Sequence, residues 1–319
     1  MTNKIAFVAW TLTKRSKVLA GYLNADIITY KKYFSNSFLR LMHYKILAIL
    51  TMLKLFHQKY DTIFVQIPPI QAALTTFIYC KITGTKLIFD THSGIFFPKG
   101  LHQKIYLCLY RFITKHITLN IVHNDSIFIR SSLKNAPSVV LEDKISYQPS
   151  RHIRLERLKI SVICGYGKDE PIQEILVAVD LLPDIEFYFT GDSTKLKFEK
   201  PVSNIHLTGY LSDKDYENCL RTADVIVVLT TRPDTVLCGD YEAVGLEKPL
   251  ITSNTQTLRK YFYKGTIFTS NDSKSIAEAI NTATQNLDKL SKEISELKKE
   301  KEENWEKQFA IVQRVLSEK

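Results

Sequence analysis

The sequence predicts an α/β protein with two doubly wound domains, and three observations lead to this expectation. Short runs of β-branched and aromatic residues alternate with stretches of helical period along almost the whole chain, which is the pattern of βαβ units and parallel sheets. The alternation restarts near residue 157, after a polar and poorly periodic stretch at 150–154. The length of 319 residues also suits two domains better than one core.

Each half of the chain contains six candidate strands, and each is a short apolar run that turn or polar residues interrupt. Helical stretches such as 171–182, 212–221 and 254–262 give the crossover length that parallel strands need. Pro68-Pro69 stops the third strand and opens a helix, because Pro lacks a strand's N–H and suits a first helical turn. The expected strands are Ile5–Trp10, Ala25–Thr29, Thr62–Ile67, Lys86–Asp90, Ile117–His123, Ser138–Leu141, Lys159–Cys164, Ile185–Thr190, Asn204–Leu207, Asp224–Leu229, Pro249–Thr252 and Gly265–Phe268.

The positive charge belongs to the first half of the chain. The net charge is +10, but residues 1–150 hold 19 Lys and Arg against 6 Asp and Glu, whereas the remainder holds 24 against 27. Such asymmetry indicates that one half faces a polyanion, either nucleic acid or an anionic membrane. No helix-turn-helix, RRM or zinc pattern is present and Lys outnumbers Arg, so we expect no nucleic-acid partner.

Two apolar helices of this half carry basic residues. The first, 38–60, has its longest uncharged run between Lys45 and Lys54, far shorter than the roughly 20 residues of a membrane-spanning helix. In the second, 101–116, Lys104, Arg111 and Lys115 share one helical face. We expect peripheral attachment to an anionic leaflet through these three residues. The alternative is that both are core helices with basic edges.

The compartment is expected to be the cytoplasm, at the inner face of the membrane. The five Cys residues are scattered without the spacing of a disulfide framework or a zinc site. The N-terminal stretch shows no long apolar segment of a signal peptide.

Polar residues gather where two expected strands of the first half end. Residues 90–94, Asp-Thr-His-Ser-Gly, follow one strand, and His123-Asn124 follows the next. Ligands of open parallel sheets bind at the carboxyl ends of the strands. The sequence therefore predicts a site at this edge.

The clearest motif of the second half is "RPDTVLCGDYEAVGLEKPLIT", residues 232–252. Gly239 precedes a helix whose free N–H groups can accept phosphate oxygens. Glu242 lies about one turn in, where a carboxylate can accept both hydroxyls of a ribose. This segment resembles the nucleotide-sugar signature of glycosyltransferase family 4, and segments 163–192 and 204–230 resemble the rest of that family's nucleotide domain.

The resemblance implies the GT-B fold, in which two Rossmann-like domains face each other across a cleft. It implies an acceptor domain at 1–156, a nucleotide-sugar domain at 157–302, and a C-terminal helix at 303–319 that crosses back to the first domain. It implies catalytic roles for His92 and Asp234. The donor would contact Gly165, Lys168, Arg232, Thr235, Gly239 and Glu242, and the acceptor side would include Trp10, Arg15, Ser93, His123 and Asn124.

The sequence departs from the family pattern at two places. Asp234 stands where the family usually has a first Glu, so the contact to the sugar uses a shorter side chain. Many relatives hold the donor diphosphate with an Arg and a Lys around the loop after the first strand of this domain. Here the loop offers Lys168, but Ile172 and Gln173 stand where the second base is expected.

The expected activity is hexosyl transfer from a nucleotide diphosphate sugar to an acceptor hydroxyl, with retention of configuration as the resemblance implies. Basic side chains and helix N-termini can stabilise the leaving diphosphate, so we expect no metal and no cofactor. The acceptor is expected to be a lipid-linked or polysaccharide intermediate of surface glycan synthesis. Two alternatives remain: a non-catalytic or regulatory GT-B subunit, or a nucleotide-sugar epimerase. UDP and GDP donors are not distinguished.

Overall fold

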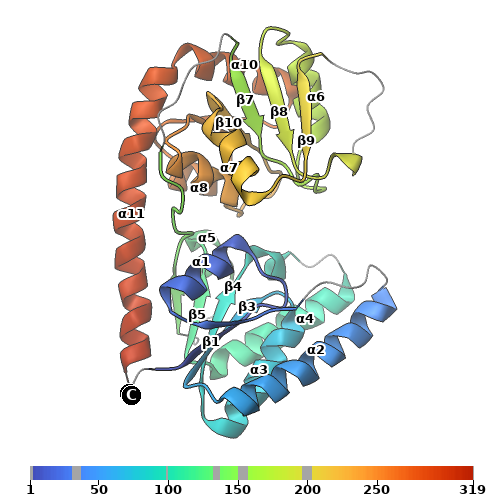
Figure 1. The fold of residues 1–319 in the computed structure, drawn as a ribbon, viewed down its shortest axis with the longest axis vertical. Coiled ribbons are helices and arrows are strands. Elements are labelled where there is room, and N and C mark those ends of the chain that lie inside the picture. The colour runs from blue at the N-terminus through green and yellow to red at the C-terminus, as the bar shows by residue number, and fades with distance from the viewer. Residues whose placement is uncertain are drawn as a thin grey trace. The chain divides into compact units, whose positions relative to one another are not determined.

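The computed structural model describes residues 3–30, 37–97, 100–131, 137–149, 157–195 and 203–318. All twelve expected strands form, and they pair into two parallel six-stranded sheets with flanking helices (Figure 1). The predicted α/β class with two doubly wound sheets is confirmed.

The first sheet has the strand order β2-β1-β3-β4-β5-β6, with every neighbouring pair parallel. The strand order reverses between β1 and β3. Its strands are β1 (Ile5–Val8), β2 (Asp26–Ile28), β3 (Thr62–Ile67), β4 (Lys86–Thr91), β5 (Leu119–Val122) and β6 (Ser138–Val140). Its helices are α1 (Lys14–Tyr22), α2 (Ser37–Gln58), α3 (Ile70–Thr83), α4 (Leu101–Ile113) and α5 (Asp125–Ser131), with 3-10 turns η1 (Ser93–Phe96) and η2 (Thr114–His116).

Two buried clusters lie on opposite faces of this sheet. Side chains alternate along a strand, so Ala6 and Val8 point to one face of β1 and Phe7 to the other. Ala6 and Val8 pack with the buried residues of α2, α3 and α4. Phe7 packs with α1 and with Trp305 of α11 (Leu287–Ser317). Right-handed crossovers explain the division, because the chain moves in opposite directions from β1 to β2 and from β2 to β3.

The second sheet has the order β12-β11-β10-β7-β8-β9, and the order reverses between β7 and β10. Its strands are β7 (Lys159–Val162), β8 (Glu186–Thr190), β9 (Ile205–Gly209), β10 (Val225–Val228), β11 (Leu250–Ser253) and β12 (Thr266–Thr269). Its helices are α6 (Ile172–Asp180), α7 (Asp213–Arg221), α8 (Cys238–Gly245), α9 (Gln256–Tyr261) and α10 (Ser273–Gln285), with the 3-10 turn η3 (Ser193–Lys195).

Local sequence sets the ends of several helices. The side chains of Thr13, Ser212, Thr255 and Asp272 each accept a backbone N–H at the start of α1, α7, α9 and α10, as N-cap residues do. Gly84 ends α3 with a φ of +76°, a conformation that glycine adopts without strain.

The contacts divide the chain into two units. The first comprises Met1–Lys144 with Asn304–Lys319, and the second comprises Ile145–Glu303. The expected domain boundary, between 156 and 157, lies at the edge of 150–156, outside the described residues. Helix α11 begins at Leu287, earlier than the expected C-terminal helix, and only its last part belongs to the first unit. No helix in the described part of the chain is long and apolar enough to cross a bilayer.

Candidate functional site

Two loops of the second unit meet where the strand order reverses: residues 163–171 after β7 and residues 229–237 after β10. The Thr231 N–H donates to the Asp169 carbonyl oxygen at 2.7 Å, and the Arg232 guanidinium pairs with the Asp169 carboxylate at 2.9 Å. Doubly wound folds bind ligands at such switch points. The structure therefore brings the loop of Lys168 together with Arg232.

The first of these loops surrounds a carboxylate with backbone N–H groups. Glu170 accepts the N–H of Gly165 at 3.0 Å and that of Gly167 at 2.8 Å. Convergent backbone N–H groups of this kind bind anions, phosphate included. Lys168 is exposed beside them and forms no ion pair with the described residues. The loop thus holds an internal anion in an arrangement that suits a phosphate oxygen.

Close packing positions this loop and the start of α8. Gly191, after β8, has a φ of +90°, and a Cβ there would lie 2.2 Å from the Cys164 carbonyl oxygen. At Gly239 a Cβ would approach a methyl carbon of Val228 to 3.0 Å. Gly239 therefore lets the N-terminus of α8 approach the sheet closely, in addition to its expected role beside phosphate.

Glu242 lies in α8 with 8% of its surface exposed. The Tyr216 hydroxyl of α7 donates to its Oε2 at 2.6 Å. Burial, and then the neighbouring Glu242 carboxylate, raise the pKa of Tyr216 well above its usual range. The tyrosine thus stays protonated and directs the carboxylate.

Two buried atoms near the start of α8 have no hydrogen-bond partner among the described residues, Thr235 Oγ1 and Asp240 Oδ1. A buried polar atom without a partner costs free energy unless a ligand or water satisfies it. The other Asp240 oxygen accepts the Leu237 N–H at 3.0 Å, and burial raises the pKa of Asp240 to about 7. Asp234, the expected catalytic residue next to Thr235 in the sequence, is partly exposed.

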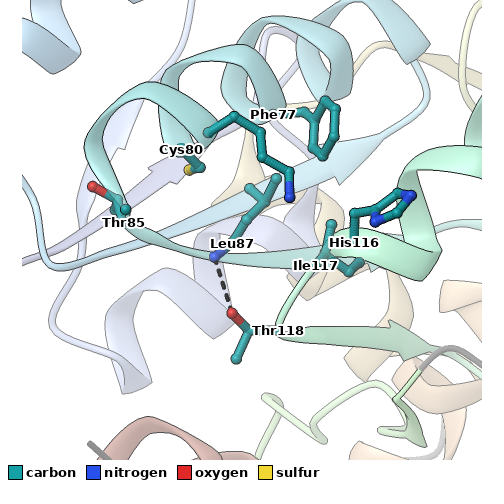
Figure 2. A pocket seen from close by; sticks show the side chains of 9 residues that line it. Phe77, Cys80, Thr85, Leu87, His116, Ile117 and Thr118 are labelled. Atoms are coloured by element: carbon teal, nitrogen blue, oxygen red, sulfur yellow. Dashed lines mark hydrogen bonds between the residues drawn. The ribbon is translucent and has the colours of Figure 1, made fainter.

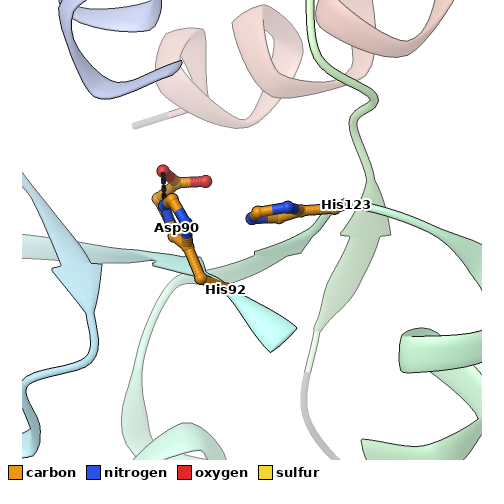
Figure 3. Close-up of side chains that lie close together, drawn as sticks. All are labelled: Asp90, His92 and His123. Carbon is orange, nitrogen blue, oxygen red and sulfur yellow. Dashed lines mark hydrogen bonds and ion pairs between the residues drawn. The ribbon is translucent and has the colours of Figure 1, made fainter. Parts of the chain in front are cut away.

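In the first unit, the exits of β4 and β5 bring three titratable side chains together: Asp90, His92 and His123 (Figure 3). His92 Nε2 lies 3.3 Å from Asp90 Oδ2, and the rings of His92 and His123 meet edge to face with centroids 4.4 Å apart. The His92 backbone N–H also donates to the Ile67 carbonyl oxygen at 2.8 Å. Three of the polar residues expected at this edge, Asp90, His92 and His123, therefore form one cluster.

Arg15 anchors the cluster from α1. Its Nε donates to Asp90 Oδ1 at 3.0 Å, and its other nitrogens reach Asp143 and the carbonyl oxygens of Leu141 and Glu142. Burial opposes the charge of both partners. Burial is the largest single effect on each group, but the neighbouring opposite charges and hydrogen bonds together outweigh it, so the pKa of Asp90 falls and that of Arg15 rises. Arg15 was expected on the acceptor side, and the structure places it as a buried support for Asp90.

His123 is held neutral. Burial first, and then the nearby Arg15 charge, lower its pKa to about 3. Its Nε2 is buried without a hydrogen-bond partner among the described residues. A neutral imidazole with one unsatisfied nitrogen can accept or donate one hydrogen bond, depending on its tautomer.

The cluster of Asp90, His92 and His123 also has ligand types that bind metal ions. However, Asp90 is already paired with the Arg15 guanidinium, and this positive charge would oppose a cation. The sequence contains one Asp-x-Asp, Asp213-Lys214-Asp215, and it forms the first turn of α7 behind the Ser212 cap.

The remaining acceptor-side residues differ in exposure. Trp10 is 2% exposed, and its indole N–H donates to the Thr51 hydroxyl at 3.0 Å, so it supports the core. Asn124 is buried and caps α5 through the Ile127 N–H. Ser93 is partly exposed at the start of η1.

Two cavities open at opposite ends of the first sheet. One of about 280 Å³ adjoins the loops after β3 and β4, where Pro68, Pro69 and Gly94 meet His102 and Tyr106 of α4. The other, of about 460 Å³, lies at the C-terminal end of α3, where Figure 2 shows Phe77, Cys80 and His116 around it. Of these two cavities in the described part of the chain, the smaller one lies at the carboxyl ends of the strands.

The expected membrane-facing residues Lys104, Arg111 and Lys115 are all exposed. No sequence motif predicts a role for Tyr216 or Glu170, or the pairing of Arg15 with Asp90. A glycine directly after a strand, here Gly191 after β8, is the sequence signal for the close backbone approach at Cys164.

Comparison with known proteins shows the fold. No family model matches the sequence, and no curated protein is detectably similar to it. Among solved structures, the chain is similar to HepE of Anabaena in complex with UDP and glucose, with a TM-score of 0.74 and 13% identity over 99% of this chain and 100% of that one.

It is also similar to sucrose-phosphate synthase from Thermosynechococcus elongatus, with a TM-score of 0.76 and 13% identity over 98% and 99% of the two chains. It is similar, too, to a protein described as a putative UDP-N-acetylglucosamine 2-epimerase from Listeria monocytogenes. The TM-score is 0.57 and the identity 12%, over 92% of this chain and 90% of that one. The chain therefore has the GT-B fold over nearly its whole length.

Proposed function

We propose that the chain transfers a sugar from a nucleotide diphosphate to an acceptor hydroxyl. The observation that carries this proposal is the arrangement at the β7–β10 switch point. There the loop after β7 offers convergent N–H groups. The loop after β10 contacts it through Arg232, contains the unpartnered Thr235 hydroxyl and leads into the N-terminus of α8. The similarity to HepE, solved with UDP and glucose, supports a nucleotide-sugar donor.

The donor site works through charge and backbone dipoles. Glu242, directed by Tyr216, accepts the ribose hydroxyls. The diphosphate replaces the Glu170 carboxylate on the N–H groups of Gly165 and Gly167, and Lys168 and Arg232 balance its charge. The N-terminus of α8 adds positive dipole as the leaving group forms. These groups are sufficient without a metal ion, and the family resemblance favours retention of configuration.

The first unit supplies the acceptor side. Asp90 orients the His92 ring, and the unsatisfied nitrogen of His123 offers a further hydrogen bond to a sugar hydroxyl. The cavity beside Pro68 and Gly94 receives the acceptor, which we infer to be lipid-linked or a glycan intermediate. The basic charge of residues 1–150 supports action at the inner face of an anionic membrane.

One observation favours a second candidate, a GT-B subunit that binds but does not transfer. Asp169 pairs with Arg232, and Glu170 occupies the loop N–H groups, so acidic residues engage the donor-side groups. In this case the chain would bind nucleotide weakly and need a partner for activity.

The experiment is a thermal-shift and transfer screen with UDP- and GDP-sugars on the wild type, Glu242→Gln and Glu278→Gln. Glu278 is an exposed residue of α10 and serves as the matched control. We expect stabilisation by one nucleotide class, loss of it in Glu242→Gln and no change in Glu278→Gln. Stabilisation without measurable transfer would select the second candidate. Equal binding by both variants would remove Glu242 from the site.

A further inference from the structure

Helix α2 is apolar on its outer side as well as its inner side. Leu47 and Leu55 are buried in the core against the first sheet. On the opposite side, Ile46, Ile49 and Leu53 recur at helical spacing and are 53%, 60% and 62% exposed. A helix that is apolar all round is ordinarily enclosed by protein or lipid, yet within the described chain nothing covers this side.

The two neighbouring helices repeat this arrangement. Leu74, Ile78 and Ile82 form an exposed line along α3, four residues apart. A second exposed line follows α4 at Leu101, Ile105, Cys108 and Phe112. The spacing shows that these residues lie on one side of each helix.

The three lines belong to one surface. The buried residues of α2, α3 and α4 share one core against the same face of the sheet, and α3 contacts both α2 and α4 (Figure 1). Their exposed lines therefore point away from the sheet together, and we call this surface the outer face. Helices α2, α3 and α4 together carry 12 of the 22 exposed large apolar side chains in the described part of the chain. Monomeric soluble proteins rarely expose a contiguous apolar patch of more than a few hundred Å².

The charge of the outer face has one sign. The sequences of α2, α3 and α4 contain no Asp or Glu. The exposed basic residues on them are Lys45, Lys54, Lys81, Lys104 and Arg111. A second copy of the chain would bring the same positive charges together across a two-fold interface, which is unfavourable. An apolar surface that carries only positive charge instead matches an anionic lipid leaflet.

We propose that the outer face docks on an anionic membrane and inserts its apolar side chains at the boundary of headgroups and acyl chains. The basic residues contact lipid phosphates. The larger cavity lies at the C-terminal end of α3, where Lys81 lines it and no carboxylate does. His116 also lines it (Figure 2). It suits the headgroup phosphate of an anionic lipid.

This surface also gives the acceptor a route, and this part rests on the proposed function. The smaller cavity is lined by Tyr44 of α2, by Ile70 and Gln71 of α3, and by Tyr106 of α4. It therefore opens at the end of the docked helices nearest to His92. A lipid-linked acceptor can then reach the site while its tail stays in the bilayer.

The first test measures co-sedimentation with vesicles of phosphatidylglycerol and phosphatidylcholine in equal parts, and with phosphatidylcholine alone. The test variant is Ile49→Gln, Leu53→Gln, Ile82→Gln. The matched control, Val177→Gln, Leu181→Gln, Leu207→Gln, changes three exposed apolar residues of the second unit. We expect the test variant to lose about tenfold or more in partitioning to anionic vesicles, and the control to match the wild type. Lys81→Gln should reduce the preference for anionic over neutral vesicles.

The second test reports insertion directly. The two native tryptophans, Trp10 and Trp305, are 2% and 3% exposed, so an added exposed tryptophan dominates any change in emission. The tryptophan emission of Ile82→Trp should shift to the blue when anionic vesicles are added, and brominated acyl chains should quench it. Leu181→Trp, at a similarly exposed position of the second unit, should do neither.

Three outcomes would overturn the docking proposal. The first is equal vesicle binding by the two triple variants, and the second is no binding of the wild type to either kind of vesicle. The third is a dimer of the wild type in sedimentation velocity that the triple variant Ile49→Gln, Leu53→Gln, Ile82→Gln abolishes. Nucleotide thermal shift is measured in parallel on every variant. Normal nucleotide binding without vesicle binding rejects only the docking face. Vesicle binding without nucleotide binding rejects only the proposed transferase function.

Discussion

The Tyr216 hydroxyl donates to Glu242 Oε2 at 2.6 Å, and both side chains are largely buried from solvent. The pair joins α7 to α8 and fixes the carboxylate proposed to bind the donor ribose. A buried carboxylate that loses its hydrogen-bond donor bears the full cost of its desolvation.

Tyr216→Phe should therefore lower the free energy of unfolding by about 1–3 kcal/mol and weaken nucleotide binding. Denaturant titration and nucleotide titration measure the two effects. The control is Tyr263→Phe, which removes a comparable hydrogen bond to Glu300 at an exposed site, where we expect a change within about 0.5 kcal/mol. Equal losses in the two variants would show that the buried pair has no special role.

Asp90→Asn should destabilise the first unit by about 1–3 kcal/mol, because the buried Arg15 guanidinium loses one of its two carboxylate partners and keeps only Asp143. The pKa of Asp90 is lowered in the folded state. The stability it contributes is therefore present above the unfolded pKa near 4 and is lost as the pH falls below it. Urea titration at pH 7 and at lower pH measures this. Asp61→Asn, at an exposed position, is the control, and an equal effect there would contradict the assignment.

Asp240 should have the opposite pH dependence. Its pKa is raised from 3.8 to about 7 by burial, so the folded protein binds a proton that the unfolded chain releases. The stabilisation is complete below about pH 4 and is lost as the pH rises to about 7. Asp240→Asn should flatten the fall in stability over this range. If thermal melts of the variant and the wild type show the same slope, the raised pKa is wrong.

Gly191→Ala should destabilise the second unit more than Gly209→Ala does. Both glycines have a positive φ, so both substitutions carry a backbone cost of about 1 kcal/mol or more. At Gly191 the added Cβ would also meet the Cys164 carbonyl oxygen, whereas at Gly209 nothing lies within 4 Å. Thermal unfolding ranks the two variants. Comparable melting temperatures would mean that the loop after β7 moves aside without cost.

Sugar transfer should persist in EDTA, since Lys168, Arg232 and the N-terminus of α8 are proposed to stabilise the leaving diphosphate. Release of nucleotide diphosphate is followed before and after chelation, with added Mg²⁺ as the control. Activity that appears only with Mg²⁺ or Mn²⁺ would contradict metal independence.

The sequence by itself determined the strands and the two-sheet class. Each strand is a local run of apolar, β-branched and aromatic residues, so its existence depends on neighbours along the chain. The same holds for the helix caps at Thr13 and Ser212, whose side chains bond N–H groups three residues away. The strand ends also placed Asp90 and His92 at the binding edge, because all parallel strands leave a sheet at one edge.

Only the tertiary structure decided what these residues contact. Arg15 and Asp90 are 75 residues apart, and Tyr216 and Glu242 are 26 apart, so no local pattern joins them. The same is true of α2, whose apolar residues surround the helix. The sheet decides which of them are buried, and the outer face is what remains exposed after one side of each helix has packed against that sheet.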